Sequence, residues 1–368
     1  MREKTKNIIV IVLVAALLAT FSLWCWLREA DTYSDSERRV LAKFPTLNTQ
    51  TLLSGEFMSK FEDYSLDQFP MRDTFRQIKA LTEFNLFLRL DNNDIYLADG
   101  HVSKIEYPIK PDMLDNAAAR FEYLYETYMA DKDMNIYLSI VPDKNYFLAE
   151  QSGHLALDYD ELIEYFRGKT EYMQYIEVRD LLSADDYYYT DTHWRQEKIL
   201  DIAQRLAAEM GVTLSATYTE NTLEHPFYGV YSGQSALDLT PDTIKYLTND
   251  VLDGCIVTSY DSGEPVIKHV YDLDKATGKD PYEMFMSGND AILTLENPAA
   301  TTDRELIIFR DSFGSSISPL FAEGYAKVTL VDIRYVKSDM VGDFVTFEDQ
   351  DVLFLYSTML LNNSLAFK

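Results

Sequence analysis

The chain has 368 residues, of which 47% are hydrophobic and 13% aromatic, and its formal net charge is −27. This hydrophobic content argues against a disordered chain, and the length predicts two domains, or one large domain with an appendage. The negative charge argues against nucleic acid as a partner, because phosphates require a basic surface, and against an anionic membrane surface as the main partner.

The first elements in chain order are a short basic segment and an uncharged run of twenty residues, 8–27. Twenty apolar residues are enough for a helix to cross a bilayer. Arg2, Lys4 and Lys6 precede the run, so we expect this end in the cytoplasm and the rest of the chain outside. A cleaved signal peptide is the alternative, but the run is longer than usual and lacks a clear cleavage site. Residues 1–27 are therefore predicted to be a cytoplasmic tip and a transmembrane anchor.

Residues 28–90 are predicted to form a membrane-proximal helical region. Apolar side chains recur at helical spacing through 57–64 and again through 75–84. Pro70 divides the region into two helices, because proline interrupts the interior of a helix. We interpret this region as a packing stalk.

Residues 91–368 are predicted to form one α/β domain. A hairpin is expected around Asp99 and Gly100. Apolar strands are expected at 135–141, 175–182, 305–309, 327–333 and 351–357, and helices at 116–133, 195–211 and 316–324. Short apolar strands separated by helices predict a parallel sheet with helices on both faces, a three-layer arrangement. Ligands of such sheets bind at the carboxyl ends of the strands.

Residues 213–300 differ from the rest of this domain. They are rich in Thr, Tyr, Gly and Asp, with short alternating runs and few helix signals. We predict a β-rich insertion. Its role, in contacting a substrate or in covering the site, stays open.

The stretch RDSFGSS places Ser312 just after the predicted strand 305–309. Gly314 permits a tight turn, and backbone N–H groups of residues 312–314 are candidates to stabilise an oxyanion. The α/β-hydrolase motif G-x-S-x-G is not matched, because Arg310 stands where its first glycine would be. A serine that only caps a helix is an equal alternative.

The stretch YYYTDTHW contains an acid and a base two residues apart, Asp191 and His193. A serine nucleophile needs a base, and the base needs a partner that holds its tautomer. A polar turn and a metal pair are the alternatives, but no third or fourth ligand is suitably spaced, so no metal site is predicted. Together with Ser312, the pair becomes a candidate catalytic triad.

Together these two stretches resemble the DHHW family and the extracytoplasmic alginate-acetylation proteins, which are SGNH-hydrolase-like domains. Further stretches that resemble this family are SERRVLAKFP (36–45), DQFPMRD (67–73), FYGVYSGQSA (227–236), YEMFMSGND (282–290) and VDIRY (331–335). The resemblance covers nearly the whole chain after residue 27. Its triad runs in the order Asp, His, Ser, as in a permuted SGNH domain.

The resemblance implies Ser312 as the nucleophile, His193 as the general base and Asp191 as the residue that orients it. Gly288 and Asn289 resemble the Gly-Asn donors of an SGNH oxyanion site. The remaining expectations rest on side-chain chemistry. Trp194 is either a packing residue or a surface on which a sugar stacks, Asp311 braces the turn, and Lys144 lies near the crevice or in a solvated loop. Two departures weaken the family pattern: Thr192 replaces the first histidine of Asp-His-His-Trp, and Arg310 replaces a glycine.

The function that the resemblance implies is that of a single-pass, membrane-anchored, extracytoplasmic O-acetyltransferase. It would acetylate an exopolysaccharide or cell-wall glycan through an acetyl-serine intermediate, without a cofactor. A multi-spanning membrane O-acyltransferase would supply the acetyl group. A carbohydrate O-acetyl esterase and a non-catalytic glycan-binding or scaffold component are the alternatives. The glycan, the modified hydroxyl, the oligomeric state and cleavage of the anchor stay open.

Overall fold

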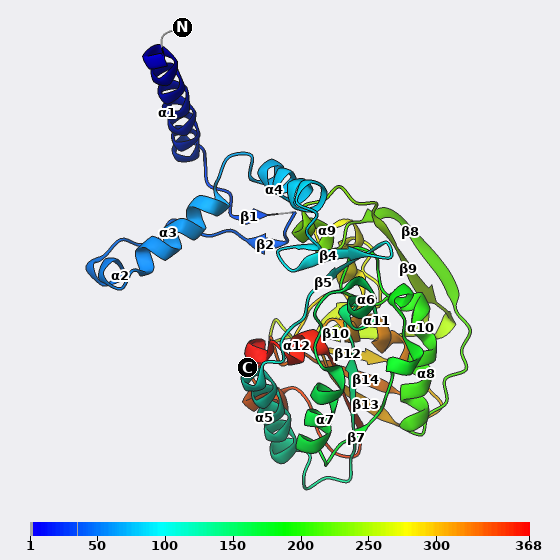
Figure 1. Cartoon of the computed structure of the whole chain (residues 1–368). Coiled ribbons are helices and arrows are strands. Elements are labelled where there is room, and N and C mark those ends of the chain that lie inside the picture. The colour runs from blue at the N-terminus through cyan, green and yellow to red at the C-terminus, as the bar shows by residue number, and fades with distance from the viewer. Residues whose placement is uncertain (1–2, 35) are drawn as a thin grey trace. The chain divides into compact units, whose positions relative to one another are not determined.

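The computed structural model describes residues 3–34 and 36–368 and divides into two units (Figure 1). The first unit comprises Met1–Asn92 and Ser232–Asp238, and the second comprises Asn93–Tyr231 and Leu239–Lys368. The first unit therefore ends close to the boundary expected at residue 90. It also takes seven residues from the stretch expected to be a β-rich insertion.

The first unit begins with α1 (Glu3–Leu27), which has no buried residue. Among the described residues, α1 is the one helix long and apolar enough to cross a membrane, a property that a signal sequence shares. Arg2 of the expected basic flank lies outside the described residues. The other elements are α2 (Thr49–Leu53), α3 (Glu56–Asp67), α4 (Arg72–Leu81), a π-helical turn (Thr82–Leu86), β1 (Tyr33–Ser34), β2 (Arg39–Val40) and β3 (Asp91–Asn92).

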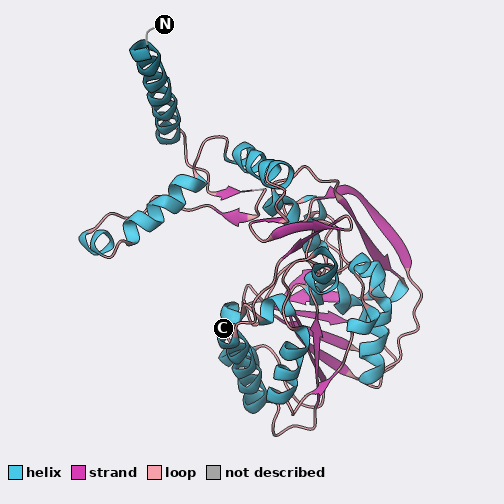
Figure 2. Ribbon diagram, viewed as in Figure 1, coloured by secondary structure: helices cyan, strands magenta, loops and turns pink. Residues whose placement is uncertain are grey.

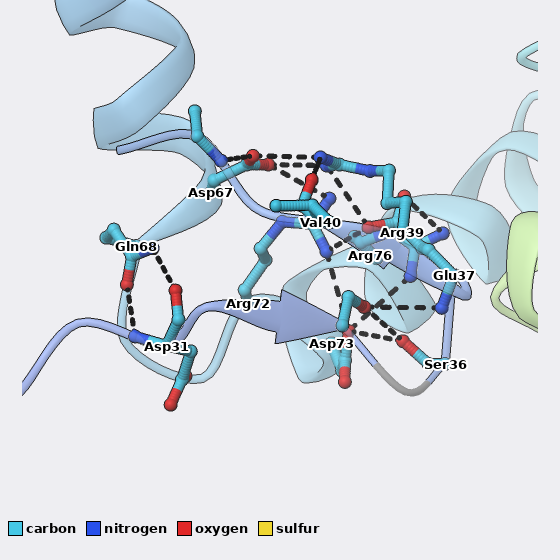
Figure 3. Close-up of polar contacts among 12 residues, drawn as sticks. Asp31, Ser36, Glu37, Arg39, Val40, Asp67, Gln68, Arg72, Asp73 and Arg76 are labelled. Carbon is cyan, nitrogen blue, oxygen red and sulfur yellow. Dashed lines mark hydrogen bonds and ion pairs between the residues drawn. The ribbon is translucent and has the colours of Figure 1, made fainter. Parts of the chain in front are cut away.

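An ion-pair cluster connects the segments of this unit (Figure 3). Asp67 accepts two hydrogen bonds from Arg39, at 2.8 and 2.5 Å. Glu37 pairs with Arg72 at 2.5 Å and with Arg76 at 3.3 Å. The Arg39 hydrogen bond lowers the pKa of Asp67; burial opposes the charge of Glu37, but the three arginines still lower its pKa. The cluster thus links β2, α3 and α4 through charges that stabilise one another.

The second unit contains an eight-stranded sheet in the order β11-β10-β12-β14-β13-β15-β6-β7. Five strands run parallel: β14 (Lys327–Val331), β13 (Glu305–Arg310), β15 (Asp351–Ser357), β6 (Asn135–Val141) and β7 (Gln174–Tyr175). Three antiparallel strands extend it: β12 (Ile292–Glu296), β10 (Ile256–Ser259) and β11 (Val266–Lys268). Part of the stretch expected as an insertion is therefore continuous with the main sheet.

Side chains of the central strands alternate between two hydrophobic clusters. Leu306 and Ile308 belong to one cluster, whereas Ile307 and Phe309 belong to the other. Successive strand residues point to opposite faces, so each cluster occupies one face of the sheet. Helices cover both faces (Figure 2): α5 (Pro111–Tyr128) and α7 (Tyr159–Lys169) on one, and α8 (Leu200–Glu209) and α11 (Phe313–Ile317) on the other. The three-layer α/β class predicted from the sequence is confirmed, with a sheet that is mixed rather than wholly parallel.

The remaining elements of the second unit lie around this core. They are β4 (Ile95–Ala98), β5 (His101–Lys104), α6 (Asn145–Ser152), β8 (Thr219–Phe227), β9 (Asp242–Thr248), α10 (Asp250–Gly254) and α12 (Thr358–Leu361). α9 (Val230–Ser235) has its first two residues in the second unit and the rest in the first. The predicted hairpin at Asp99 and Gly100 joins β4 to β5. β8 and β9 form a separate antiparallel ribbon.

Several expected elements have other bounds in the structure. The strand expected at 327–333 is β14, which ends at Val331, and the helix expected at 116–133 is α5, which begins and ends five residues earlier. The helix expected at 316–324 is α11 followed by a 3₁₀ turn at Ser318–Phe321.

The strand expected at 175–182 pairs with β6 only through Gln174 and Tyr175. The Glu177 carboxylate then accepts the N–H groups of Val178 and Arg179 and turns the chain away from the sheet. The helix expected at 195–211 begins only at Leu200, after a 3₁₀ turn at Gln196–Lys198.

Candidate active site

The two stretches with candidate catalytic residues meet at the carboxyl edge of the parallel strands. Ser312 follows β13 after one residue and precedes α11. Asp191 and His193 lie in a turn between Tyr187 and Trp194, which pair as an isolated β-bridge. The turn is closed by the N–H of Tyr188, which donates to the carbonyl of His193 at 3.0 Å. His193 and Ser312, which are 119 positions apart in the sequence, therefore lie in one site.

A continuous chain of polar contacts runs through Asp191, His193 and Ser312. Nδ1 of His193 lies 2.6 Å from Oδ1 of Asp191, and Nε2 lies 2.7 Å from Oγ of Ser312. A carboxylate only accepts hydrogen bonds, so Nδ1 carries the proton and Nε2 accepts the proton of the serine hydroxyl. This is the geometry required of a nucleophile, a base and an orienting acid.

The surrounding structure holds this acid and base in place. Asp191 is 1% exposed, and its two oxygens accept the N–H groups of His193 at 3.1 Å and Val230 at 2.8 Å. The imidazole of His193 stacks on the ring of Tyr282, with centroids 3.9 Å apart and planes 9° apart. Burial raises the pKa of Tyr282, so that its ring remains neutral beside His193. The base is thus restrained both along its hydrogen bonds and across its ring face.

The turn at Ser312 leaves one backbone donor available. The N–H of Phe313 donates to the Asp311 carboxylate at 3.0 Å, and the N–H of Gly314 donates to the Asp311 carbonyl at 3.1 Å. The N–H of Ser312 has no acceptor within the described part of the chain, and its side chain makes no helix-capping bond. Of the N–H groups expected at 312–314, only that of Ser312 is free to meet an oxyanion. The helix-capping alternative for the serine side chain is wrong.

Asp311 braces this turn. Its second oxygen accepts the N–H of Ser357 at 2.8 Å, which ties the turn to the end of β15. Arg310, which replaces the glycine of the motif that the sequence resembles, is fully buried. It donates to Oγ of Ser315 at 3.1 Å and lies 3.7 Å from Asp332. The arginine therefore leaves the contact between Ser312 and His193 intact.

A cavity of about 130 Å³ opens beside Ser312 and His193. Gly288 and Asn289 both line it, so the structure brings them to the candidate nucleophile. The N–H of Gly288 already donates to the carbonyl of Phe285 at 3.2 Å, so it is not an oxyanion donor in this state. Nδ2 of Asn289 donates to Glu283 at 3.0 Å and still has a second hydrogen. Asn289 thus remains a candidate donor, and Gly288 does not.

Trp194 is a packing residue, and its role as a surface for sugar stacking is ruled out by burial. The indole is 0% exposed. Its Nε1 donates to Oγ of Ser316 at 2.9 Å and to the carbonyl of Phe313 at 3.1 Å. Tyr282 also donates to Oγ of Ser316, at 2.8 Å. These contacts connect the turn that carries His193 to the helix that follows Ser312.

Lys144 is a buried side chain and lies in no solvated loop. The residue is 2% exposed, and its Nζ donates to the carbonyls of Tyr188 at 2.8 Å and Tyr189 at 3.1 Å. Burial lowers its pKa to about 7, although the charges of Asp191 and Asp242 oppose the shift. Asp242 in turn accepts the N–H groups of Tyr189 and Thr190. The Lys144 amine and the Asp242 carboxylate therefore bind the backbone just before Asp191.

Sequence reasoning missed several residues of the site. Tyr282, Asp242 and Arg334 carry no catalytic pattern, although Tyr282 and Arg334 fall in stretches that resemble the family. Arg334 lines the cavity and forms a double hydrogen bond with the buried Asp332, at 2.9 and 2.6 Å. Within residues 3–34 and 36–368, no group of three or more His, Cys, Asp and Glu side chains is placed to hold a metal ion.

Comparisons with known proteins identify the fold. No protein-family model matches the sequence, and no curated protein is similar to it. A solved DHHW family protein from Eubacterium siraeum is 22% identical, with 75% of this chain and 94% of that chain covered and a TM-score of 0.60. PatB1 from Bacillus cereus is 17% identical, with 73% and 97% covered and a TM-score of 0.58, and PatB1 has also been solved with a sulfonyl adduct.

The O-acetyltransferase domain of AlgJ from Pseudomonas putida aligns more weakly. It is 11% identical, with 74% of this chain and 93% of that chain covered and a TM-score of 0.43. The expected likeness to the DHHW family is confirmed at the level of the fold.

Proposed function

We propose that this chain is an O-acetyltransferase that uses Ser312, His193 and Asp191 as a catalytic triad. The proposal rests on the unbroken chain of contacts at 2.7 and 2.6 Å from the serine hydroxyl to the buried carboxylate. The resemblance of the motifs around these residues to acetylating proteins supports the choice of an acetyl group.

In the first half-reaction, His193 takes the proton of the Ser312 hydroxyl, and Oγ attacks the acetyl carbonyl of the donor. The N–H of Ser312 stabilises the oxyanion, assisted by Nδ2 of Asn289. The C–O or C–S bond to the leaving group breaks, and His193 returns the proton to it. Asp191 stays ionised and holds the imidazolium that forms between the two transfers.

In the second half-reaction, the acetyl group moves from Ser312 to a hydroxyl of the acceptor. His193 removes the proton of that hydroxyl as its oxygen attacks the acetyl carbonyl. The ester bond to Oγ breaks, and the proton passes from His193 to Ser312. Each group returns to its starting state, so the chain turns over without a cofactor.

The acceptor in this proposal is an exopolysaccharide or cell-wall glycan outside the cytoplasm. α1 supports this placement as an anchor or a signal sequence. A donor made from a cytoplasmic acetyl source then requires a membrane protein that carries the acetyl group across. A multi-spanning O-acyltransferase is the partner that fits this requirement.

The test is the intact mass of the full chain in detergent after exposure to p-nitrophenyl acetate. We expect one acetyl group on the wild type and none on Ser312→Ala. A methanesulfonyl fluoride adduct, also lost in Ser312→Ala, would report the same nucleophile independently. Ser215→Ala, a change in an exposed serine before β8, is the matched control and should label like the wild type.

Three outcomes separate the candidate functions. Acetyl transfer from Ser312 to a glycan supports the transferase. Release of the acetyl group only to water, with glycan acetyl esters hydrolysed, supports the esterase. If the wild type forms no adduct and turns over no ester, the proposal fails and the non-catalytic reading takes its place.

A further inference from the structure

A second, larger cavity of about 570 Å³ lies in the same unit. Its lining comes from the turn after β10, the start of β12, the segment after β14 and the 3₁₀ turn Ser338–Asp343 with Phe344. We call it the flanking groove, and its defining residues are Tyr260, Ala291, Ile292, Tyr335, Met340 and Phe344.

The flanking groove opens at the same edge of the sheet as Ser312. Ile292 at the start of β12 pairs with Val331 at the end of β14. Val331 in turn pairs with Phe309, near the end of β13 and three residues before Ser312. The start of an antiparallel strand thus lies beside the carboxyl ends of the parallel ones, where ligands of such sheets bind.

Two chain segments pass directly from the catalytic cavity into the groove. One runs from Asn289, which lines the cavity, to Ile292, which lines the groove. The other runs from Arg334 to Val336, and its middle residue, Tyr335, lines both. The groove therefore adjoins the catalytic cavity, and Tyr335 forms part of the lining of both.

The two volumes suggest different occupants. Ligand pockets that bury a whole small molecule measure about 300–1,000 Å³. The groove falls in this range at about 570 Å³, whereas the cavity beside Ser312 holds about 130 Å³. The cavity thus has room for an acetyl group and the reacting part of one sugar. The rest of an acceptor must lie elsewhere.

The side chains that face the groove suit a sugar chain. Tyr335 is 48% exposed, Met340 41% and Phe344 42%. The guanidinium of Arg334 lies 5.4 Å from the centre of the Tyr335 ring and restrains it. Exposed aromatic rings present an apolar face with a polar edge, which matches the C–H face and the hydroxyl rim of a pyranose. Lys337 and Lys368 add hydrogen-bond donors.

We propose that the flanking groove binds the sugars next to the one that is acetylated, with Tyr335 as the stacking surface nearest Ser312. The acceptor is then an oligosaccharide or polysaccharide, selected by its length, and a single sugar is a poor acceptor. This inference rests on the proposed transferase function and adds the part of the acceptor that the groove recognises.

The experiment follows the decay of acetyl-Ser312 by intact mass, after loading the full chain with p-nitrophenyl acetate. The acceptors are size-fractionated fragments of the source organism's own surface polysaccharide, from single sugars to long chains. In the wild type, decay with transfer to the glycan should accelerate with fragment length. In Tyr335→Ala and Phe344→Ala, the ratio of the rates with long and short fragments should fall about fivefold or more, the size expected for lost aromatic stacking.

Tyr335→Phe keeps the ring and should keep the length preference. Tyr123→Ala, a 40% exposed tyrosine on α5, is the matched control and should also keep it. Equal rates with short and long fragments in the wild type would overturn the inference. The inference would also be overturned if acetyl-Ser312 formed but transferred its acetyl group to no fragment. It would be overturned as well if Tyr335→Ala and Phe344→Ala both kept the wild-type preference for long fragments. If acetyl-Ser312 never forms, the proposed function itself has failed.

Discussion

At the scale of single residues, the site depends on what surrounds Asp191. Its two oxygens accept hydrogen bonds from Nδ1 of His193 and from the backbone N–H groups of His193 and Val230. A neutral side chain of the same shape cannot fill these roles, because its nitrogen only donates. The carboxylate thus sets both the tautomer of His193 and the path of the turn.

We predict that Asp191→Asn slows acetylation of Ser312 by about 10³- to 10⁴-fold, because the imidazole loses the partner that holds its tautomer. The rate is measured by stopped-flow release of p-nitrophenol. Asp160→Asn, at a side chain that is 83% exposed, is the control and should react like the wild type. A rate within about tenfold of the wild type would mean that Asp191 does not serve His193.

Because of Lys144, the free energy of unfolding should change with pH between neutral and alkaline values. The pKa of Lys144 is about 7 in the folded chain and near 10.5 when exposed. Between these values the unfolded chain binds a proton that the folded chain has released, so this group's contribution to the free energy of unfolding increases as pH rises from 7 towards 10.5. The residue therefore costs most stability at neutral and acidic pH.

We predict that Lys144→Met reduces the rise in stability between pH 7 and pH 9. Urea unfolding followed by tryptophan fluorescence at the two pH values measures this. The exposed Lys132→Met should behave as the wild type. Lys144→Met should also slow acetylation, since the carbonyls of Tyr188 and Tyr189 lose their donor. The same pH dependence in wild type and Lys144→Met would contradict the buried, titrating lysine.

At the scale of elements, the turn between β13 and α11 positions the nucleophile. A Cβ atom at Gly314 would lie 2.6 Å from Cβ of Arg310, which is buried and held near Asp332. Neither side of this contact has room to move. Glycine is therefore required here by close packing beneath Ser312.

We predict that Gly314→Ala destabilises the second unit by about 1–3 kcal/mol, as overpacking does, and slows acetylation of Ser312. Thermal unfolding and the acetylation rate are the two measurements. The control is Gly254→Ala in α10, where a Cβ meets nothing within 4 Å. Full stability and full activity in Gly314→Ala would show that the turn adapts.

Because of the ion-pair cluster, the stability of the elements of the first unit should decrease at acidic pH. The folded-state pKa values of Glu37 and Asp67 lie below their ordinary values of 4.5 and 3.8. Lowered pKa values mean that the stabilisation is present above the unfolded values and is lost as pH falls through the folded ones. β2, α3 and α4 should therefore loosen in acid.

We predict faster amide hydrogen exchange in residues 28–92 below about pH 4.5, after correction for the intrinsic rate. Glu37→Gln should show this loosening already at pH 7. Glu56→Gln removes an exposed pair with Lys60 and should change nothing, because such pairs contribute little. If the exchange rates depended neither on pH nor on the Glu37→Gln change, the ion-pair cluster would not be what holds these elements together.

At the scale of the whole molecule, α1 is a candidate membrane anchor or signal sequence. An anchor and a signal sequence satisfy the same length and hydropathy, and the helix has no buried residue. We predict that the mature protein retains residues 3–27 and sediments with membranes. The mass of the mature protein measures retention, and deletion of residues 1–27 should release it. A mature chain that begins after residue 27 would show cleavage.

Local sequence patterns were sufficient for the core elements and for the candidate nucleophile. A continuous apolar run at residues 306–309, buried throughout, marks β13, and Ser312 follows β13 after one residue, where a strand-end ligand site is expected. Asp191 and His193 were found because an acid two residues from a histidine is a local pattern. Such features depend on neighbours in the chain, and these neighbours are visible in the sequence.

Only the tertiary structure decided which groups are free and which are occupied. In the folded chain Trp194 and Lys144 are buried, and the N–H of Gly288 donates to the carbonyl of Phe285. The N–H of Ser312 has no hydrogen-bond acceptor among the described residues. The tertiary structure also joined β10, β11 and β12 to the main sheet. Burial and hydrogen-bond partners are set by segments far apart in the chain. Their packing is a property of the folded whole, which no local pattern encodes.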